Sequence, residues 1–192
     1  MEVKNILLVG VGGQGTILAS KILSEGLMEA GYDVKMSEIH GMSQRGGSVS
    51  TQIRYGKEVY SPIIGEGEAD ILVSFETMET ARWISYIKPN ARVIVNEYRI
   101  YSPEVLQGKF EYPETTVADL KAAGVDVTVV KAAQIASDLG NVKAMNIVLL
   151  GSLIVGLGLE DIDWTSIVAR SVKPAFVELN QKALQMGMEA AR

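Results

Sequence analysis

The feature that most constrains the fold is a glycine-rich turn between an apolar run and a helical pattern. The run at 5–9 leads directly into Gly10-Val-Gly-Gly-Gln-Gly15, and an uninterrupted apolar run is typical of a central parallel strand buried on both faces. Apolar residues recur at helical spacing over 16–30, and Gly31 is a natural stop. A second strand is expected at 34–38. The chain therefore opens as strand, glycine turn, helix and strand, which is the first half of a doubly wound fold.

The remaining pattern predicts a three-layer α/β/α, Rossmann-like domain with a mixed, mostly parallel sheet and an antiparallel hairpin. The hairpin is expected where 48–55 alternates polar and apolar side chains and Gly56-Lys57 could turn it back into 58–60. No linker or repeat interrupts the chain, so we expect a single domain over 1–192. Further strands are predicted at 70–75, 92–96 and 125–130, and further helices at 78–86, 118–123, 131–138, 142–156, 164–172 and from Pro174 onward.

Composition excludes several classes of partner. The net charge of −5 leaves no basic face for nucleic acid, and lysine and arginine are too scattered to form a polybasic membrane motif. The longest apolar run, at 147–159, is shorter than the ~20 residues that a membrane span requires, so it is interpreted as a buried helix or an interface. Residues 1–9 resemble a strand rather than a signal peptide. We therefore expect a cytoplasmic protein that binds neither nucleic acid nor membrane.

The absence of cysteine limits the redox chemistry of the chain. With no cysteine there is no disulfide, no thiolate metal site and no cysteine-ligated iron–sulfur cluster. With one histidine, a site of several histidines is also excluded, so no metal site is predicted. Any redox reaction that involves this chain must use an organic cofactor or another polypeptide.

The glycine turn matches G-x-G-x-x-G in the expected position between a strand and a helix. In this pattern Gly10 permits the turn, Gly12 permits close approach of a ligand, and Gly15 lets the helix pack onto the strand. Glu38 ends the next strand roughly 20 residues later, where a dinucleotide-binding fold places the acid that holds a ribose hydroxyl. Gly13 and Gln14 add hydrogen-bonding groups beyond what a phosphate needs. The alternative is that the glycines only make a tight corner.

A polar segment follows the second strand and contains the only histidine of the chain. His40 can exchange a proton near neutral pH, Gln44 can donate and accept, and Arg45 can bind a carboxylate or phosphate through two hydrogen bonds. Gly46 and Gly47 allow backbone N–H groups to face a ligand. The functional interpretation is a recognition loop with His40, Gln44 and Arg45 as candidate catalytic residues. The alternative is a polar loop in which Arg45 pairs with Glu38 or Asp33.

Three motifs together resemble the gamma-type domain of the 2-oxoacid:ferredoxin oxidoreductases. They are Leu8-Val-Gly-Val-Gly-Gly-Gln-Gly15, Ser37-Glu-Ile-His-Gly-Met-Ser-Gln-Arg-Gly-Gly-Ser-Val49 and Gly140-Asn-Val-Lys-Ala-Met-Asn-Ile-Val-Leu-Leu-Gly151. The second motif is similar to the indolepyruvate branch of the family, because the pyruvate branch has a Tyr-Gly-Pro-Glu-like stretch before Arg-Gly-Gly. The resemblance covers nearly the whole chain.

The resemblance implies a complex that oxidises an aryl 2-oxoacid to acyl-coenzyme A and CO2 and reduces ferredoxin. Thiamine diphosphate, Mg2+ and the iron–sulfur clusters would lie in a larger partner subunit, which agrees with the lack of cysteine and of a Gly-Asp-Gly stretch in this chain. The chain would complete the partner's active-site region, would contact coenzyme A or substrate, and would be inactive alone, where it could form a homodimer. The cofactor-contact candidates are Gly10, Gly12, Gly13, Gln14, Gly15, Glu38, Gly46 and Gly47.

Two other functions stay open at this point. The glycine turn with Glu38 also fits a free-standing NAD-dependent dehydrogenase. The apolar helix expected at 142–156 also fits a non-catalytic assembly module.

Overall fold

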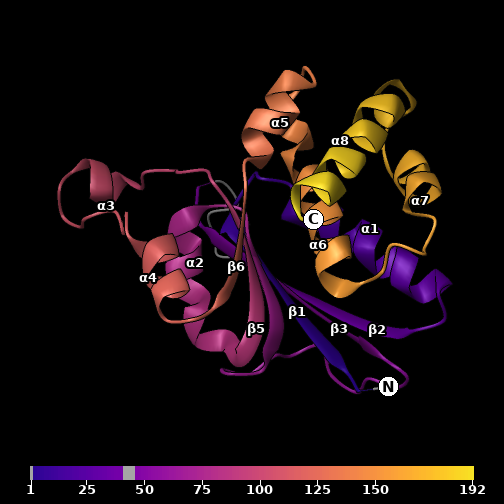
Figure 1. Cartoon of the computed structure of the whole chain (residues 1–192), viewed down its shortest axis with the longest axis horizontal. Coiled ribbons are helices and arrows are strands. Elements are labelled where there is room, and N and C mark those ends of the chain that lie inside the picture. Colours follow the sequence, from indigo (N-terminus) through magenta and orange to yellow (C-terminus); the bar gives the residue numbers. More distant parts are fainter. Residues whose placement is uncertain (1, 41–45) are drawn as a thin grey trace.

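The protein is built on one six-stranded sheet. A computed structural model describes residues 2–40 and 46–192, and of His40 it describes the backbone alone. The strand order is β2-β3-β1-β4-β5-β6 (Figure 1). Strands β1, β4, β5 and β6 are parallel neighbours, whereas β3 is antiparallel to both β1 and β2. The predicted mixed, mostly parallel sheet is therefore confirmed. The strand bounds are β1 Lys4–Val11, β2 Asp33–His40, β3 Ser48–Gly56, β4 Ala69–Ser74, β5 Ile87–Asn96 and β6 Asp126–Val130.

The antiparallel hairpin exists, but its position was wrongly predicted. Strand β3 pairs with the preceding strand β2 along its whole length, from Asp33 opposite Gly56 to His40 opposite Val49. Its other edge is occupied by β1, so no edge remains for residues 58–60. That segment is fixed instead by the N–H of Val59, which donates to Asp33 Oδ2 at 2.8 Å.

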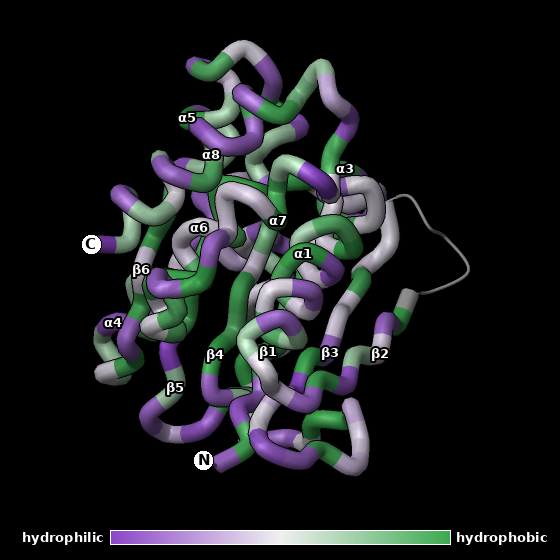
Figure 2. The backbone as a smooth tube through the Cα atoms, turned by 90° about the vertical axis from the view of Figure 1, so that its right-hand side faces the viewer, coloured by the Kyte–Doolittle hydropathy of each residue, from purple (hydrophilic) through white to green (hydrophobic). Residues whose placement is uncertain are grey.

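Helices cover both faces of the sheet and make the three predicted layers. One face carries α1, α6, α7 and α8, and the opposite face carries α2 and α4 (Figure 1). Strand β1 shows why its apolar run is continuous: Ile6 and Leu8 belong to the first core, whereas Leu7 and Val9 belong to the second. Figure 2 shows β4 as hydrophobic along its length, with hydrophilic residues at its lower end. The helix bounds are α1 Thr16–Glu29, α2 Thr77–Trp83, α3 Pro103–Leu106, α4 Thr116–Ala122, α5 Ala132–Asp138, α6 Met145–Leu157, α7 Trp164–Ser171 and α8 Val177–Ala190, with 3-10 turns at Ile84–Tyr86, Val142–Ala144 and Pro174–Phe176.

Helix α6 lies inside the domain. Every residue from Met145 to Ile154 is buried within this chain. The apolar face that suggested an assembly surface is therefore already covered by α1, α8 and the sheet. The sequence could not separate these cases, because a helix that is apolar all round fits either environment.

Helices α6 and α8 approach each other through two glycines. A Cβ at Gly187 would lie 1.9 Å from the carbonyl oxygen of Val148, and one at Gly151 would lie 2.2 Å from that of Leu184. Ser152 Oγ also donates to the carbonyl oxygen of Gly187 at 2.8 Å. The contact surface of α8 therefore follows its small residues.

This close contact corrects the buried face expected for the last helix. The repeat of Phe176, Leu179, Ala183, Met186 and Ala190 predicted that face. The buried residues of α8 are instead Asn180, Ala183, Leu184 and Gly187, while Phe176 and Met186 are 44% and 39% exposed.

Candidate functional site

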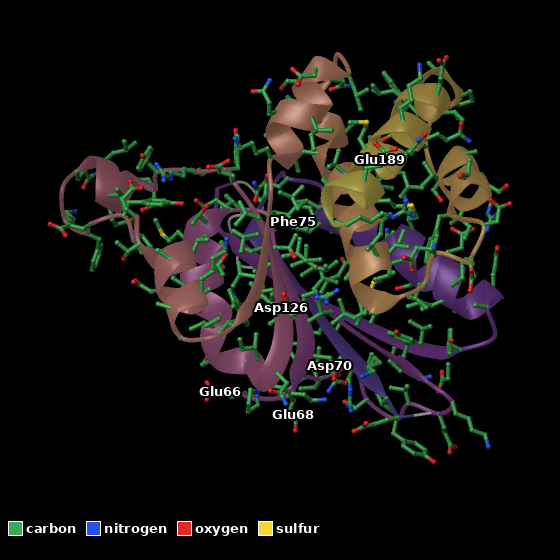
Figure 3. The ribbon with its side chains drawn as sticks, in the orientation of Figure 1. Glu66, Glu68, Asp70, Phe75, Asp126 and Glu189 are labelled. Atoms are coloured by element: carbon green, nitrogen blue, oxygen red, sulfur yellow. The ribbon has the colours of Figure 1, made fainter. Side chains whose placement is uncertain are left out.

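The site lies at the edge where the parallel strands end, and its first wall is the glycine turn after β1. Phe75, which follows β4, lies at this edge, whereas Glu66, Glu68 and Asp70 lie at the opposite edge (Figure 3). Gln14 is 6% exposed and spans the turn. Its Oε1 accepts from the N–H of Val11 at 2.7 Å, and its Nε2 donates to the carbonyl oxygen of Phe75 at 2.9 Å. The amide is therefore engaged at both ends inside the protein.

The hydrogen bonds of the Gln14 side chain require glycine at position 10. A Cβ at Gly10 would lie 2.8 Å from Gln14 Oε1 and 2.9 Å from Phe75 Cβ. A side chain there would displace either the amide or β4, so glycine serves close packing at this position.

A second amide ties the following loops to the same carbonyl. Asn96 at the end of β5 is fully buried, and its Nδ2 donates to the carbonyl oxygen of Phe75 at 3.1 Å. Its Oδ1 accepts from the N–H of Ala132 at 3.1 Å, where α5 begins. The turns after β1, β4 and β6 are thus joined into one rigid edge.

Helix α1 begins at this edge with an open N-terminus. Gly15 precedes the helix with φ +83°, and no side chain within residues 2–40 and 46–192 caps the helix. A Cβ at Gly15 would lie 2.6 Å from Asn146 Nδ2, which donates to the Gly15 carbonyl oxygen at 3.2 Å. The first N–H groups of a helix have no partner within it and carry the positive end of the helix dipole. This end of α1 therefore favours an anionic group.

The structure brings together the two glycine segments that the sequence singled out. The N–H of Gly12 donates to the carbonyl oxygen of Gly47 at 2.9 Å, and the N–H of Gly46 donates to that of Gly12 at 3.3 Å. Strand β2 leads into the same region, because His40 pairs with Val49 at its end. Gln44 and Arg45, the two candidates just before Gly46, lie outside the described residues.

A cavity of about 300 Å³ lies between the glycine turn with the start of α1 and the facing residues of β2 and β3. Glu38 is part of its wall, and its Oε1 is buried without a hydrogen-bond partner among residues 2–40 and 46–192. The cavity therefore offers an acceptor on one side and the N-terminus of α1 on the other. Its walls are formed by Gly12, Gly13, Gly15, Thr16, Ile17, Glu38, Ile39, Val49, Ser50 and Thr51.

The position of Glu38 differs from that in a simple dinucleotide-binding fold. There the strand that carries the acid neighbours the first strand, whereas here β3 lies between β1 and β2. Thr51 of β3 pairs with Glu38 and separates it from β1. Since neighbouring strands are about 4.8 Å apart, the acid is one strand spacing farther from the glycine turn.

Two buried glutamates at the start of α2 are polar groups that the sequence analysis missed. Glu76 Oε1 accepts from the hydroxyl of Tyr112 and from the N–H of Ile100. Burial and the bond to Glu76 raise the pKa of Tyr112 above its usual range. Glu79 accepts from the hydroxyl of Ser48. The available signal was their position directly after the buried strand at 70–75, where ligand-binding groups of α/β sheets gather.

The described parts of the chain offer no metal centre and no membrane span. Within residues 2–40 and 46–192, no three histidine or acidic side chains are grouped so as to hold a metal ion. No helix in those ranges is both long and apolar enough to cross a bilayer.

Comparison with known proteins relates nearly the whole chain to one family. The family model described as pyruvate ferredoxin/flavodoxin oxidoreductase matches residues 5–190. The chain is 35% identical over 199 residues to the indolepyruvate oxidoreductase subunit IorB of Thermococcus kodakarensis, covering 100% of this chain and 98% of that protein. It is 38% identical over 193 residues to the IorB subunit of Archaeoglobus fulgidus, covering 97% of this chain and 94% of the relative.

A solved structure shares the fold over the same length. The gamma subunit of a keto/oxoacid ferredoxin oxidoreductase from Geobacter sulfurreducens superposes with a TM-score of 0.74 at 25% identity, covering 98% of each chain. The glycine turn, the β2–β3 segment and the 140–151 segment therefore belong to an architecture known from an oxidoreductase subunit.

Proposed function

Because the chain belongs to the pyruvate ferredoxin/flavodoxin oxidoreductase family, we propose that it is the non-autonomous small subunit of an aryl 2-oxoacid:ferredoxin oxidoreductase. Indolepyruvate is the substrate that the IorB relatives indicate. The complex would form an acyl-coenzyme A and CO2 and reduce ferredoxin. Residues 1–192 would act as one gamma-type domain in the cytoplasm.

The observation that carries this proposal is the pair of hydrogen bonds between Gly12 and the Gly46-Gly47 segment. These bonds place two segments of the family motifs around one cavity. His40, Gln44 and Arg45 precede Gly46 in the chain, and we propose them as the residues that face substrate in the assembled complex. The arginine would bind the carboxylate of the oxoacid.

The cavity also fits part of a nucleotide-bearing cofactor such as coenzyme A. The N-terminus of α1 favours a phosphate, Glu38 can accept from a ribose hydroxyl, and Ile17 and Ile39 add apolar walls. Gly13 leaves open space beside the turn, since among the described residues no atom other than those of its chain neighbours lies within 4 Å of where its Cβ would stand. A volume of about 300 Å³ suits the phosphate–ribose portion rather than the whole molecule. Gln14 contributes by holding the turn rather than by contacting the ligand.

The partner subunit would supply the redox groups. Thiolate ligands for iron–sulfur clusters have no source in a chain without cysteine. Thiamine diphosphate and Mg2+ would likewise be held by the larger subunit, where the coenzyme supplies the electron sink for decarboxylation. The chain's own residues would bind, orient and shield substrate at the subunit boundary.

The test is reconstitution. The chain alone, the large subunit alone and the co-expressed pair would be assayed with indolepyruvate, phenylpyruvate, coenzyme A and a viologen acceptor. Only the pair should reduce the viologen, and replacing Arg45 by alanine should raise the KM for the oxoacid by about tenfold or more. Turnover by the isolated chain would refute the proposal.

A free-standing NAD-dependent dehydrogenase remains the second candidate because of the glycine turn and Glu38. The insertion of β3 between β1 and β2 disfavours it. Thermal-shift titrations with NAD, NADP and coenzyme A separate the two. A shift with NAD alone would support the dehydrogenase, whereas a shift with coenzyme A alone would support the cofactor contact proposed here.

A further inference from the structure

The buried side chain of Glu79, on α2, bonds to the end of the segment Gly46–Ser48, which we call the recognition segment. Glu79 Oε2 accepts from the hydroxyl of Ser48, the residue that begins β3 and directly follows Gly46-Gly47. Glu79 Oε1 accepts from Arg82 Nε at 3.1 Å. The contact joins α2, on one face of the sheet, to the start of β3, whose next residues, Val49, Ser50 and Thr51, line the cavity.

Burial makes this contact unusual. The Glu79 side chain is 4% exposed, whereas the side chain of Arg82 is 54% exposed. Removing a carboxylate from water costs several kcal/mol unless hydrogen bonds compensate. A single bond to the exposed Arg82 would be sufficient for a carboxylate at the surface. The buried position is explained by the second bond, which only Ser48 makes among the described residues.

The geometry leads from Glu79 to the cavity in two steps. Ser48 is fixed by Glu79 on one side and by its pairing with Val11 on the other. The preceding glycines are bonded to Gly12 at the cavity wall. Loss of the charged bond should free the Ser48 side chain and loosen the Gly46–Gly47 segment, which then keeps only its backbone bonds to Gly12.

We infer that Glu79 is a positioning residue that sets the Gly46–Ser48 segment against the glycine turn and so controls substrate recognition. This inference rests on the proposed function and adds a residue outside all three family motifs. Glu79 acts through Ser48 and need not contact substrate itself. Its effect therefore falls on the KM of the complex rather than on subunit assembly.

Tyr112 provides a matched control. Its hydroxyl donates to Glu76 Oε1 and accepts from the N–H of Met78, so both bonds hold the start of α2 and neither reaches Glu79 or Ser48. Y112F therefore disturbs the same helix end without touching the recognition segment.

The experiment compares E79L, S48A, the double variant, S48T and Y112F in the co-expressed complex. Leucine has no acceptor for the Ser48 hydroxyl, whereas glutamine would keep one. E79L and S48A each remove the bond between Glu79 and Ser48, so each should raise the KM for the oxoacid about tenfold, and the double variant should show the same tenfold rather than a hundredfold change. S48T keeps the hydroxyl and should stay within about twofold of the natural complex. Y112F should lower Tm but leave the KM unchanged.

Hydrogen exchange gives a readout that does not depend on turnover. In the isolated chain, E79L and S48A should speed exchange at the amides of Gly12 and Gly46, whereas Y112F should not. Multiplying effects in the double variant, or unchanged exchange at both amides, would overturn the inference. If the natural complex shows no oxoacid turnover, the proposed function fails, and the exchange data still decide whether Glu79 positions the segment.

Discussion

Replacing Gln14 by alanine tests whether its amide holds the glycine turn. The substitution leaves the N–H of Val11 buried without its acceptor, whereas the carbonyl oxygen of Phe75 keeps the bond from Asn96. An orphaned buried donor costs about 1–3 kcal/mol. The space left by the side chain adds about 1 kcal/mol. The free energy of unfolding should therefore fall by about 2–4 kcal/mol.

For a chain of this size, 1 kcal/mol corresponds to a Tm change of about 2–4 °C, so Q14A should melt about 5–15 °C lower. Urea denaturation should give the same loss of stability. The matched control is Q134A, because Gln134 is exposed and bonds only to Asp138 in the next helical turn. A Q14A protein that melts within about 1 °C of the natural chain would show that the Gln14 amide does not hold the glycine turn.

A second variant adds a pH signature. In Q14E, the carboxyl can donate to the Phe75 carbonyl oxygen only while it is protonated, so folding should raise its pKa. Because the pKa of this carboxyl is raised, its contribution to the stability of the folded chain is complete below the pKa that it has in the unfolded chain. The contribution is lost as the pH rises through the pKa that it has in the folded chain. Q14E should therefore approach the natural stability at acidic pH and fall behind it near pH 8. An equal deficit at both would contradict the assigned hydrogen bond.

Three other changes test the packing and the titrating groups. G187A should destabilise the chain by about 1–3 kcal/mol in urea, because its methyl group would meet the Val148 carbonyl oxygen at 1.9 Å; an unchanged midpoint would contradict the close contact. Burial raises the pKa of Tyr55 to about 12, so its contribution is present below pH 10 and is lost toward pH 12. Y55F should lose less stability over that interval in alkaline denaturation. The bonds from Lys35 and the N–H of Val59 lower the pKa of Asp33. In acid denaturation, the natural chain should therefore lose stability as the pH is lowered beyond about 4, and D33N should lose less over the same interval.

The local elements could be predicted because their signals are local. The apolar run, the glycines and the helical spacing over residues 5–38 gave β1, the turn, α1 and β2 in order. The glycine turn and Glu38, which the sequence singled out, are both part of the wall of the cavity. These signals depend on neighbours in the sequence and on the rule that ligands gather at the carboxyl ends of strands.

The parts that were missed depend on contacts between distant residues. Strand β3 enters between β1 and β2, which alternation along one strand cannot reveal. Gln14 bonds to the carbonyl oxygen of Phe75, which is 61 residues away. The sequence alone therefore could not separate this internal bond from a contact with a ligand. The helical spacing placed larger apolar residues on the buried face of α8. Gly187 lies on that face instead, because the close approach of α6 requires a small residue there.

The contact between Gly15 and Asn146 joins residues 131 positions apart. Helices α6 and α7 pack on α1, although both are translated long after it. During synthesis, the face of the sheet that carries Ile6 and Leu8 can therefore be covered by α1 but not by α6 while more than a hundred further residues are translated. Emergence of α6, rather than emergence of the glycine turn, sets the moment at which the site acquires its final shape. A chaperone that shields the early strands would therefore increase the yield of folded subunit more than one that acts after release.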